Sequence, residues 1–236
     1  MYLRPAEPSD EPAMASLCTR AFFNEDLFGR VIHPHRSLYP DDVQIFWHET
    51  IRGDWVNPRN KVFVVVSPSS PSQPEDRVVG AAIWQRQGDD ENNTSVQEIT
   101  QSWRDPRPHF PPLVPTLQHP NRALDPTKKN ILEQSAEFTK HYWAGSNARN
   151  WFLMLCAVDP EFAGRGCGRL LVRWGIERAQ KDGVAASVTS SEGTNGFYLR
   201  CGFDEVVGNA NEGEGNPLKE SEVKGGDILF MWPKER

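Results

Sequence analysis

Three glycines stand at alternate positions soon after a short apolar run. The run, residues 152–158, is typical of a buried strand, and Gly164, Gly166 and Gly168 follow it before a helical pattern opens at Leu170. Residues without side chains let several backbone N–H groups approach one ligand, and the first turn of a helix adds unpaired donors and about half a positive charge. This arrangement predicts a phosphate-binding loop, with a plain glycine turn between a strand and a helix as the alternative.

Two common phosphate-binding motifs do not fit the spacing of these glycines. A dinucleotide fingerprint, G-x-G-x-x-G, fails in both registers because Arg169 and Leu171 stand where the last glycine would be. A P-loop requires Gly-Lys followed by Ser or Thr, and the segment has no such triplet. A nicotinamide-dependent oxidoreductase is therefore disfavoured.

The residues around the loop complete a longer pattern. Val158-Asp159-Pro160 leads into the glycines, a second apolar run spans residues 184–189, and the segment 193–203 carries Tyr198 and ends in Gly-Phe. Over about fifty residues the order, spacing and residue types resemble motifs A and B of the GNAT family of N-acetyltransferases. The resemblance implies that the protein binds acetyl-CoA as a cosubstrate, with its pyrophosphate in the glycine loop and its pantetheine arm beside the apolar strand.

The resemblance also implies which residues bind CoA. Backbone groups of the strand would pair with the pantetheine arm and backbone N–H groups of the loop would hold the pyrophosphate, while the two arginines of the loop either add charge or point into water. The residues implied are Cys156, Ala157, Val158, Gly164, Arg165, Gly166, Cys167, Gly168, Arg169 and Ser191. Two positions depart from the family pattern: Ala163 replaces the Gln or Arg often found there, and Ser191 replaces an Asn that contacts CoA in many relatives.

Tyr198 occupies the position at which the family commonly places a general acid. A phenol has an ordinary pKa of about 10, close to that of an alkyl thiol, so it can protonate a departing thiolate. A tyrosine of the hydrophobic core is the alternative. The sequence identifies no general base: Glu192 stands near the right strand end, and a chain of water molecules could serve instead.

The length of the chain and the order of its expected elements predict one domain. A chain of 236 residues is long for one minimal α/β domain and short for two. We therefore expect a single acyl-CoA N-acyltransferase domain over residues 1–236, with an insertion at about residues 89–150. The resemblance implies an α/β (α+β) fold with a mixed, mostly antiparallel central sheet, a V-shaped splay at the cofactor strand and helices on both faces.

Hydrophobic periodicity and turn signals place the elements of this fold. Strands are expected at residues 2–4, 61–66, 77–87, 152–158, 184–189, 203–207 and 227–232, and helices from Asp10, from Asp41, from Asp125 to Gly145 and from Leu170 to Asp182. Residues 208–226 are expected to form a polar, mobile loop. The helix inside the insertion is expected to lie across the sheet or beside the acceptor entrance, as a lid or as a structural brace.

Composition and charge exclude several classes of function. The net charge is −6 and no Lys/Arg cluster occurs, which argues against a nucleic-acid partner. The apolar runs are far shorter than the roughly twenty residues of a membrane helix, and residues 1–10 show no secretory signal, so no membrane partner is expected. The cysteines lack C-x-x-C spacing, which indicates reduced thiols in the cytoplasm. His33 and His35 are interpreted as part of a surface turn, so no metal is expected.

Together these patterns predict an acetyl-CoA-dependent N-acetyltransferase that moves an acetyl group to an amine by direct attack in a ternary complex. We expect a small-molecule amine as the acceptor, with a peptide or protein amine as an alternative, and a monomer or a homodimer. A non-catalytic CoA-binding module of the same fold is the other alternative, in which the insertion blocks the acceptor side.

Overall fold

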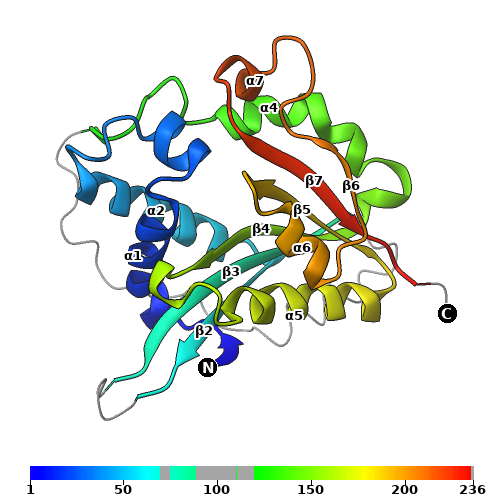
Figure 1. The fold of residues 1–236 in the computed structure, drawn as a ribbon, viewed down its shortest axis with the longest axis horizontal. Coiled ribbons are helices and arrows are strands. Elements are labelled where there is room, and N and C mark those ends of the chain that lie inside the picture. Colours follow the sequence, from blue (N-terminus) through cyan, green and yellow to red (C-terminus); the bar gives the residue numbers. More distant parts are fainter. Residues whose placement is uncertain (70–74, 89–109, 111–119, 235–236) are drawn as a thin grey trace.

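A computed structural model describes residues 1–69, 75–88, 110 and 120–234 (Figure 1). Within this part of the chain, a seven-stranded sheet has the order β1-β2-β3-β4-β5-β7-β6, and all neighbouring strands except β4 and β5 are antiparallel. The strands are β1 (Tyr2–Pro5), β2 (Asn60–Ser67), β3 (Arg77–Gln87), β4 (Asn150–Val158), β5 (Ala185–Ser191), β6 (Glu205–Asn209) and β7 (Gly225–Met231). The predicted mixed, mostly antiparallel sheet is confirmed.

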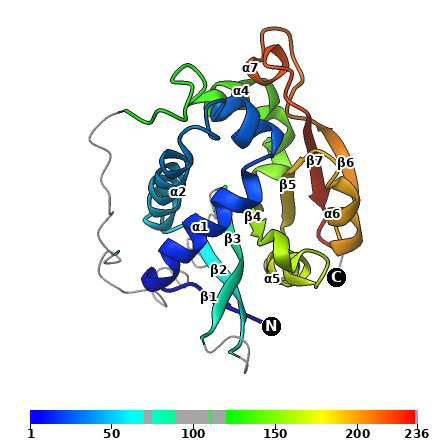
Figure 2. The same ribbon diagram turned by 60° about the vertical axis from the view of Figure 1, so that its left-hand side comes forward.

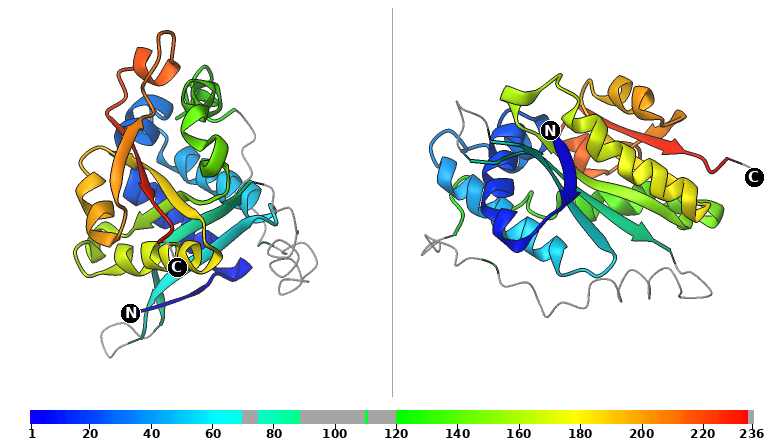
Figure 3. Two further views of the ribbon diagram at one scale, coloured as in Figure 1. Left: turned by 90° about the vertical axis from the view of Figure 1, so that its right-hand side faces the viewer. Right: turned by 90° about the horizontal axis from the view of Figure 1, so that it is seen from below.

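Helices cover both faces of the sheet, as predicted (Figures 2 and 3). The four that cover it are α1 (Glu11–Phe22) and α2 (Pro40–Trp55) on one face, and α5 (Cys167–Asp182) and α6 (Asn195–Cys201) on the other. Met14, Leu17 and Trp47 of the first pair form one core with the sheet, and Leu171 and Ile176 of α5 belong to a second. Each buried side chain of this kind stabilises the fold by about 1.5–3 kcal/mol.

Shorter elements connect these layers. They are η1 (Pro8–Asp10), the π-helix η2 (Asp26–Ile32), α4 (Ile131–Thr139), η3 (Lys140–Trp143), η4 (Gly145–Ala148), η5 (Pro160–Phe162) and α7 (Pro217–Glu220). Two of them, α4 and α7, lie in the upper part of Figure 1. A small core of their own, which includes Val31, Ile131 and Leu218, joins η2, α4 and α7.

The sheet opens between β4 and β5, which diverge soon after they begin. Residues 150–153 of β4 pair with residues 185–188 of β5, and the register ends there although both strands continue. At the same point Met154 is skipped in the antiparallel pairing of β4 with β3. A bulge of this kind bends the strand and increases its twist. The predicted V-shaped splay at β4 is therefore confirmed.

The helix after the glycine loop, α5, begins at Cys167 rather than at the predicted Leu170. Gly166 precedes it with a left-handed φ of 87°, which glycine adopts without steric cost. Cys167 is buried, and Gly168 lies so close to Phe197 that an added Cβ would be 2.9 Å from its Cζ. This first turn packs against α6, so the helix begins closer to the loop. The apolar periodicity of the sequence does not show this packing.

The helix predicted inside the insertion is shorter than expected. Residues 89–109 and 111–119 lie outside the described residues, so the loop expected there stays a prediction. α4 begins at Ile131 because Asp125, the predicted cap, closes a turn instead: its carboxylate accepts the backbone N–H and the hydroxyl of Thr127 at 2.9 and 2.7 Å. The helix ends at Thr139, and η3 and η4 follow it.

The segment between β6 and β7 is packed rather than a polar, solvated loop. It contains α7, and its Leu218 and Val223 are buried. The side chain of Asn216, which is fully buried, donates to the carbonyls of Ala210 and Glu212 at 2.8 and 2.6 Å. Side-chain amides thus pair with backbone groups that water would otherwise satisfy.

We predict opposite effects for two glycine-to-alanine changes inside helices. In α5, a Cβ added at Gly175 would lie 2.2 Å from ring atoms of the buried Trp84, so Gly175→Ala should lower the free energy of unfolding by about 1–3 kcal/mol. In α2, a Cβ added at Gly53 would meet no atom of the described residues within 4 Å, so Gly53→Ala should raise it by about 0.5–1 kcal/mol. Urea unfolding of both variants measures this, and equal effects would contradict the close packing of α5 on β3.

Candidate active site

The glycine loop joins the end of β4 to α5 and carries backbone donors that the fold does not use. Gly164 and Gly166 have left-handed φ angles of 74° and 87°, and an added Cβ on either would meet no described atom within 4 Å. The N–H groups of Gly164, Gly166 and residues 167–169 donate to no backbone carbonyl in the part of the chain that the structure describes. Together with the N-terminal dipole of α5, these donors can bind an anion such as a phosphate.

Three side chains of the loop contact the protein rather than each other. Arg165 stacks on Phe162, with its Cζ 4.9 Å from the ring centre, and Arg169 hydrogen-bonds to the side chain of Cys201 in α6. Both arginines are exposed, so their charge stays at the surface of the loop. Cys167 is buried, with its Sγ 3.4 Å from the Sδ of Met1, and therefore offers the loop its backbone N–H alone.

Asp159 fixes the loop to the sheet and to α1. Its buried carboxylate accepts hydrogen bonds from Arg20 and Arg77, each at 2.8 Å, and from the N–H of Glu161 at 3.0 Å. Burial acts to raise the pKa of Asp159, but the hydrogen bonds and the positive charge of Arg20 and Arg77 outweigh it and lower the pKa below its ordinary value. The aspartate therefore stays ionised and holds the start of the loop in one position.

The end of β4 offers an edge that can pair with an extended ligand. The N–H of Asp159 donates to the carbonyl of Val79 in β3 at 3.0 Å, and the direction of backbone groups alternates along a strand. Ala157 therefore also faces β3, whereas Cys156 and Val158 direct their N–H and C=O groups into the splay, beyond the pairing with β5. Of the three strand residues implied to bind the pantetheine arm, Cys156 and Val158 thus have backbone groups that face the splay. The backbone groups of Ala157 face β3 instead, within the sheet.

Tyr198 lies in α6 and is 8% exposed. Its ring packs against Phe197 and Phe203, with centroid distances of 5.1 and 5.7 Å. Burial raises the pKa of Tyr198 well above its ordinary value, and the thiols of Cys156 in β4 and Cys201 act in the same direction. The phenol therefore stays protonated and can donate a proton near the splayed end of β4.

A cavity of about 540 Å³ opens beside the splay. Its walls come from β4, β5, η2, α4 and the packed segment between β6 and β7. Ser191, implied to contact CoA, lines this cavity from the end of β5, across the splay from β4. The cavity is adjacent to the strand edge and suits a second substrate.

The described part of the insertion is both a wall of the cavity and a brace. Leu132 and Ser135 of α4 line the cavity. The residues that follow α4 hold it to the sheet: the hydroxyl of Tyr142 donates to Glu212 at 2.6 Å, and the indole N–H of Trp143 donates to the hydroxyl of Ser187 at 3.0 Å. These contacts are those of a brace, and the role of a lid stays a prediction.

The cavity contains one carboxylate that the sequence analysis missed, Glu25. It precedes η2, and its side chain accepts the N–H of Phe28 at 2.7 Å and hydrogen-bonds to Ser191. Burial raises the pKa of Glu25, although these hydrogen bonds lower it in part. A signal was present in the sequence, because Glu25 is an acidic residue just before the apolar stretch 27–32, but the tertiary fold is needed to bring it to β5.

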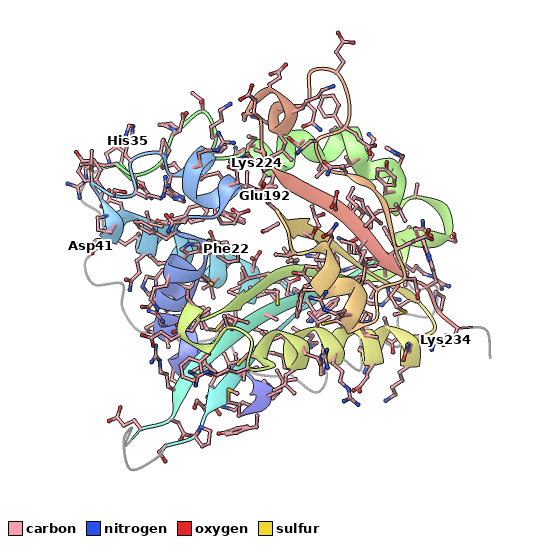
Figure 4. All side chains as sticks on the ribbon, in the orientation of Figure 1. Phe22, His35, Asp41, Glu192, Lys224 and Lys234 are labelled. Carbon is pink, nitrogen blue, oxygen red and sulfur yellow. The ribbon has the colours of Figure 1, made fainter. Side chains whose placement is uncertain are left out.

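Glu192, the acidic residue considered from the sequence as a base, is exposed and does not line the cavity. Figure 4 shows it close to Lys224 at the ends of β5 and β7, where the added Cβ of Gly225 would meet its backbone nitrogen at 2.3 Å. Glu25 therefore replaces Glu192 as the candidate base.

Among the described residues, no group of three or more His, Cys, Asp or Glu side chains could hold a metal ion. Nor does that part of the chain contain a helix of the length and hydrophobicity needed to cross a membrane. His33 is buried, with its Nδ1 2.7 Å from the carbonyl oxygen of Phe28, so its interpretation as part of a surface turn was wrong.

Comparison with known proteins finds a similarity in the part of the chain that carries this geometry. Residues 135–203 match the family model for the acetyltransferase (GNAT) family. This segment of the chain is therefore similar to the GNAT acetyltransferases. The GNAT segment runs from α4 to the end of α6 and so includes β4, the glycine loop and Tyr198.

Similar proteins extend the likeness over most of the chain. An acetyltransferase of Stachybotrys chartarum is 24% identical over 206 residues, which cover 87% of this chain and 81% of that protein. A Corynebacterium glutamicum structure of histone acetyltransferase HPA2 and related acetyltransferase has a TM-score of 0.58 at 17% identity and covers 99% of this chain and 97% of its own. Drosophila melanogaster polyamine N-acetyltransferase has a TM-score of 0.54 at 10% identity, with 98% and 99% covered. The fold of these acetyltransferase structures therefore spans nearly the whole chain.

We predict that Asp159→Asn loosens the loop in a pH-dependent way. At pH 7 it should lower the free energy of unfolding by about 1–3 kcal/mol, because two arginines lose a buried anionic acceptor. Since the folded pKa of Asp159 is lowered, its stabilisation is present above the ordinary aspartate pKa and is lost as pH falls through the folded value. The difference in free energy of unfolding between the wild type and Asp159→Asn, measured in urea, should thus become smaller below about pH 4.

The control for this measurement is Glu177→Gln, which breaks an exposed ion pair with Arg173 in α5. It should change the free energy of unfolding by about 0.5 kcal/mol or less. If Asp159→Asn differs from the wild type by the same free energy of unfolding at acid and neutral pH, the charge of the carboxylate does not hold the loop.

Proposed function

We propose that this protein is an acetyl-CoA-dependent N-acetyltransferase that moves an acetyl group to the amine of a small molecule by direct attack in a ternary complex. The observation that carries the proposal is the position of the Glu25 carboxylate in a cavity lined by residues 152–154 of β4, where the pairing with β5 ends. An acceptor in this cavity lies beside both a carboxylate and the strand that would hold the donor.

The groups of the chain fit CoA. The unused N–H groups of the glycine loop are hydrogen-bond donors for a pyrophosphate, and the outward N–H and C=O groups of Cys156 and Val158 match the amides of a pantetheine arm. Acetyl-CoA, when bound, supplies a thioester as the acyl donor. A backbone N–H at the splay can also donate to a thioester carbonyl, a contribution of the kind worth roughly 3–4 kcal/mol in other enzymes. A Thermoplasma acidophilum N-acetyltransferase with CoA bound has the same fold, with a TM-score of 0.50 at 8% identity and 98% of both chains covered.

The proposed chemistry needs two proton transfers. As the bond from the amine nitrogen to the acetyl carbon forms and the carbon–sulfur bond breaks, Glu25 accepts a proton from the amine and Tyr198 gives its phenolic proton to the thiolate. The raised pKa of Glu25 makes it a stronger base than an exposed glutamate, and the raised pKa of Tyr198 keeps its proton in place until it is needed. Burial raises the pKa of Cys156 to about 12, so its thiol stays neutral and we assign it no covalent role.

Two alternatives differ from this proposal in the acceptor side. A non-catalytic CoA-binding module requires a blocked acceptor side, whereas the described part of the insertion borders an open cavity, which supports catalysis. A peptide or protein amine is a second acceptor class. We assign the protein to the cytoplasm on its four free cysteines, and we expect a monomer or a homodimer. Calorimetry with acetyl-CoA and a thiol-release assay on amines and peptides separate these possibilities.

We predict that Gly166→Glu abolishes CoA binding in isothermal titration calorimetry, because a carboxylate at the loop would repel the pyrophosphate and occupy its space. The matched control is Gly183→Glu at the other end of α5. Both glycines have positive φ, and at both an added Cβ would meet no described atom within 4 Å, so the two changes impose a similar backbone strain. Loss of binding in both variants, or in neither, would contradict the assignment of the loop.

We predict separate kinetic effects for the two proton-transfer residues. Glu25→Gln should lower kcat/KM for the amine about 10²- to 10⁴-fold and remove the acid limb of the pH profile. In the wild type that limb rises with pH as Glu25 loses its proton, and it lies above the ordinary glutamate pKa because the folded pKa is raised. Tyr198→Phe should lower kcat with unchanged CoA affinity. Glu192→Gln is the control and should leave the rate and the pH profile as in the wild type. If the acid limb is lost in Glu192→Gln and kept in Glu25→Gln, Glu192 is the base.

A further inference from the structure

The walls of the cavity are mostly apolar. Aliphatic and aromatic side chains reach it from segments far apart in the sequence, and they include Leu27, Phe28, Leu132, Trp143, Phe152 and Leu218. Trp143 and Phe152 pack edge to face, with ring centres 5.8 Å apart, so this part of the wall is a connected surface. A volume of about 540 Å³ is within the range of pockets that enclose small ligands. The body of an acceptor in this cavity therefore lies against hydrocarbon.

The charges around the cavity leave room for one ammonium group. Among the described lining residues, Glu25 is the single carboxylate, and the proposed mechanism uses it at the reacting nitrogen. The other charged lining residues are Lys140 and Lys224, of which Lys140 is paired with Glu137. A second ammonium on the acceptor would lose its hydration without a carboxylate inside the cavity to replace it, which is costly.

Several neutral polar groups in the wall of the cavity lack a hydrogen-bond partner among the described residues. Ser135 and Ser190 are 2% and 3% exposed, both line the cavity, and the hydroxyl of neither has a hydrogen-bond partner among the described residues. The side-chain oxygen of Asn211, in the same wall, is also buried without a partner there. These three atoms are covered in this structure. A rotation of the Ser135 or Ser190 side chain about its Cα–Cβ bond would turn its hydroxyl toward the cavity, where it could pair with a hydroxyl or an amide of a ligand.

We propose that the acceptor is a primary monoamine whose body is apolar and whose other polar groups, such as a hydroxyl, are uncharged. Diamines and polyamines are then poor acceptors, because their second ammonium group would lie against the apolar walls of the cavity. This inference rests on the proposed N-acetyltransferase activity and adds to it the class of amine.

The test uses three amines of equal length that differ in the group at the far end: hexylamine, 6-amino-1-hexanol and 1,6-diaminohexane. With acetyl-CoA and the full-length protein, thiol release should give a kcat/KM for the diamine at least about tenfold below that for hexylamine, since one buried group without its partner has an effect of this size or larger. The amino alcohol should be used at least as well as hexylamine. A diamine used as well as the monoamine would overturn the inference.

A variant that adds a carboxylate to the wall tests the electrostatic cause. Leu132→Glu places a charge in α4 at a side chain that lines the cavity and is 45% exposed, so the fold should tolerate it. It should raise the ratio of diamine to hexylamine kcat/KM by about fivefold, as expected for a half-exposed ion pair. The matched control, Leu38→Glu, makes the same change at a 72% exposed position that does not line the cavity, and it should leave the ratio unchanged.

The possible outcomes distinguish a wrong class of amine from a wrong assignment of N-acetyltransferase activity. Turnover of the diamine at the rate of the monoamine, or an equal change of ratio in both leucine variants, contradicts the assigned class while leaving N-acetyltransfer in place. CoA binding without thiol release on any of the three amines contradicts the proposed activity and, with it, the inference.

Discussion

The divergence of β4 from β5 is the structural constraint on which the rest of the site depends. Two neighbouring parallel strands would normally satisfy each other's backbone groups along their full length, yet here the pairing ends at residues 153 and 188. The bulge at Met154 accompanies this separation. The opening leaves the outward backbone groups of Cys156 and Val158 to a ligand, and it also creates the space that becomes the cavity. In the proposed function, recognition of an extended donor and room for an acceptor therefore have one geometric origin.

The surrounding elements keep this opening in shape. On one side the buried carboxylate of Asp159 ties the end of β4 to α1 and β3, which sets where the glycine loop begins. On the other side α4, η2 and the segment between β6 and β7 share a small core. Their packing encloses the cavity with hydrocarbon and brings Glu25 to the end of β5. Burial in the wall of this cavity raises the pKa of Glu25, whereas burial of Tyr198 in the core beneath α5 and α6 raises the pKa of its phenol.

Local sequence signals were sufficient for the parts of the fold that local physics determines. The apolar period of β3, the glycine after α5 and the Gly-Phe after Tyr198 placed their elements closely, and motifs A and B gave the sheet and its splay. Two errors arose where a side chain bonds to a nearby backbone group in a way that periodicity does not show. Asp125 was expected to cap a helix but accepts the N–H of Thr127 in a turn, and His33 was expected at the surface but is buried with its Nδ1 beside the carbonyl of Phe28. Glu25 could not be assigned from sequence, because its role depends on contact with Ser191 across the fold.

The most direct measurement is a crystal structure of the protein with CoA bound. We expect the pyrophosphate oxygens at about 2.7–3.2 Å from backbone nitrogens of residues 164–169, and the pantetheine amides paired with the outward groups of Cys156 and Val158. Electron density for CoA with its pyrophosphate bound away from the start of α5, or its pantetheine arm outside the opening between β4 and β5, would contradict this assignment of the site.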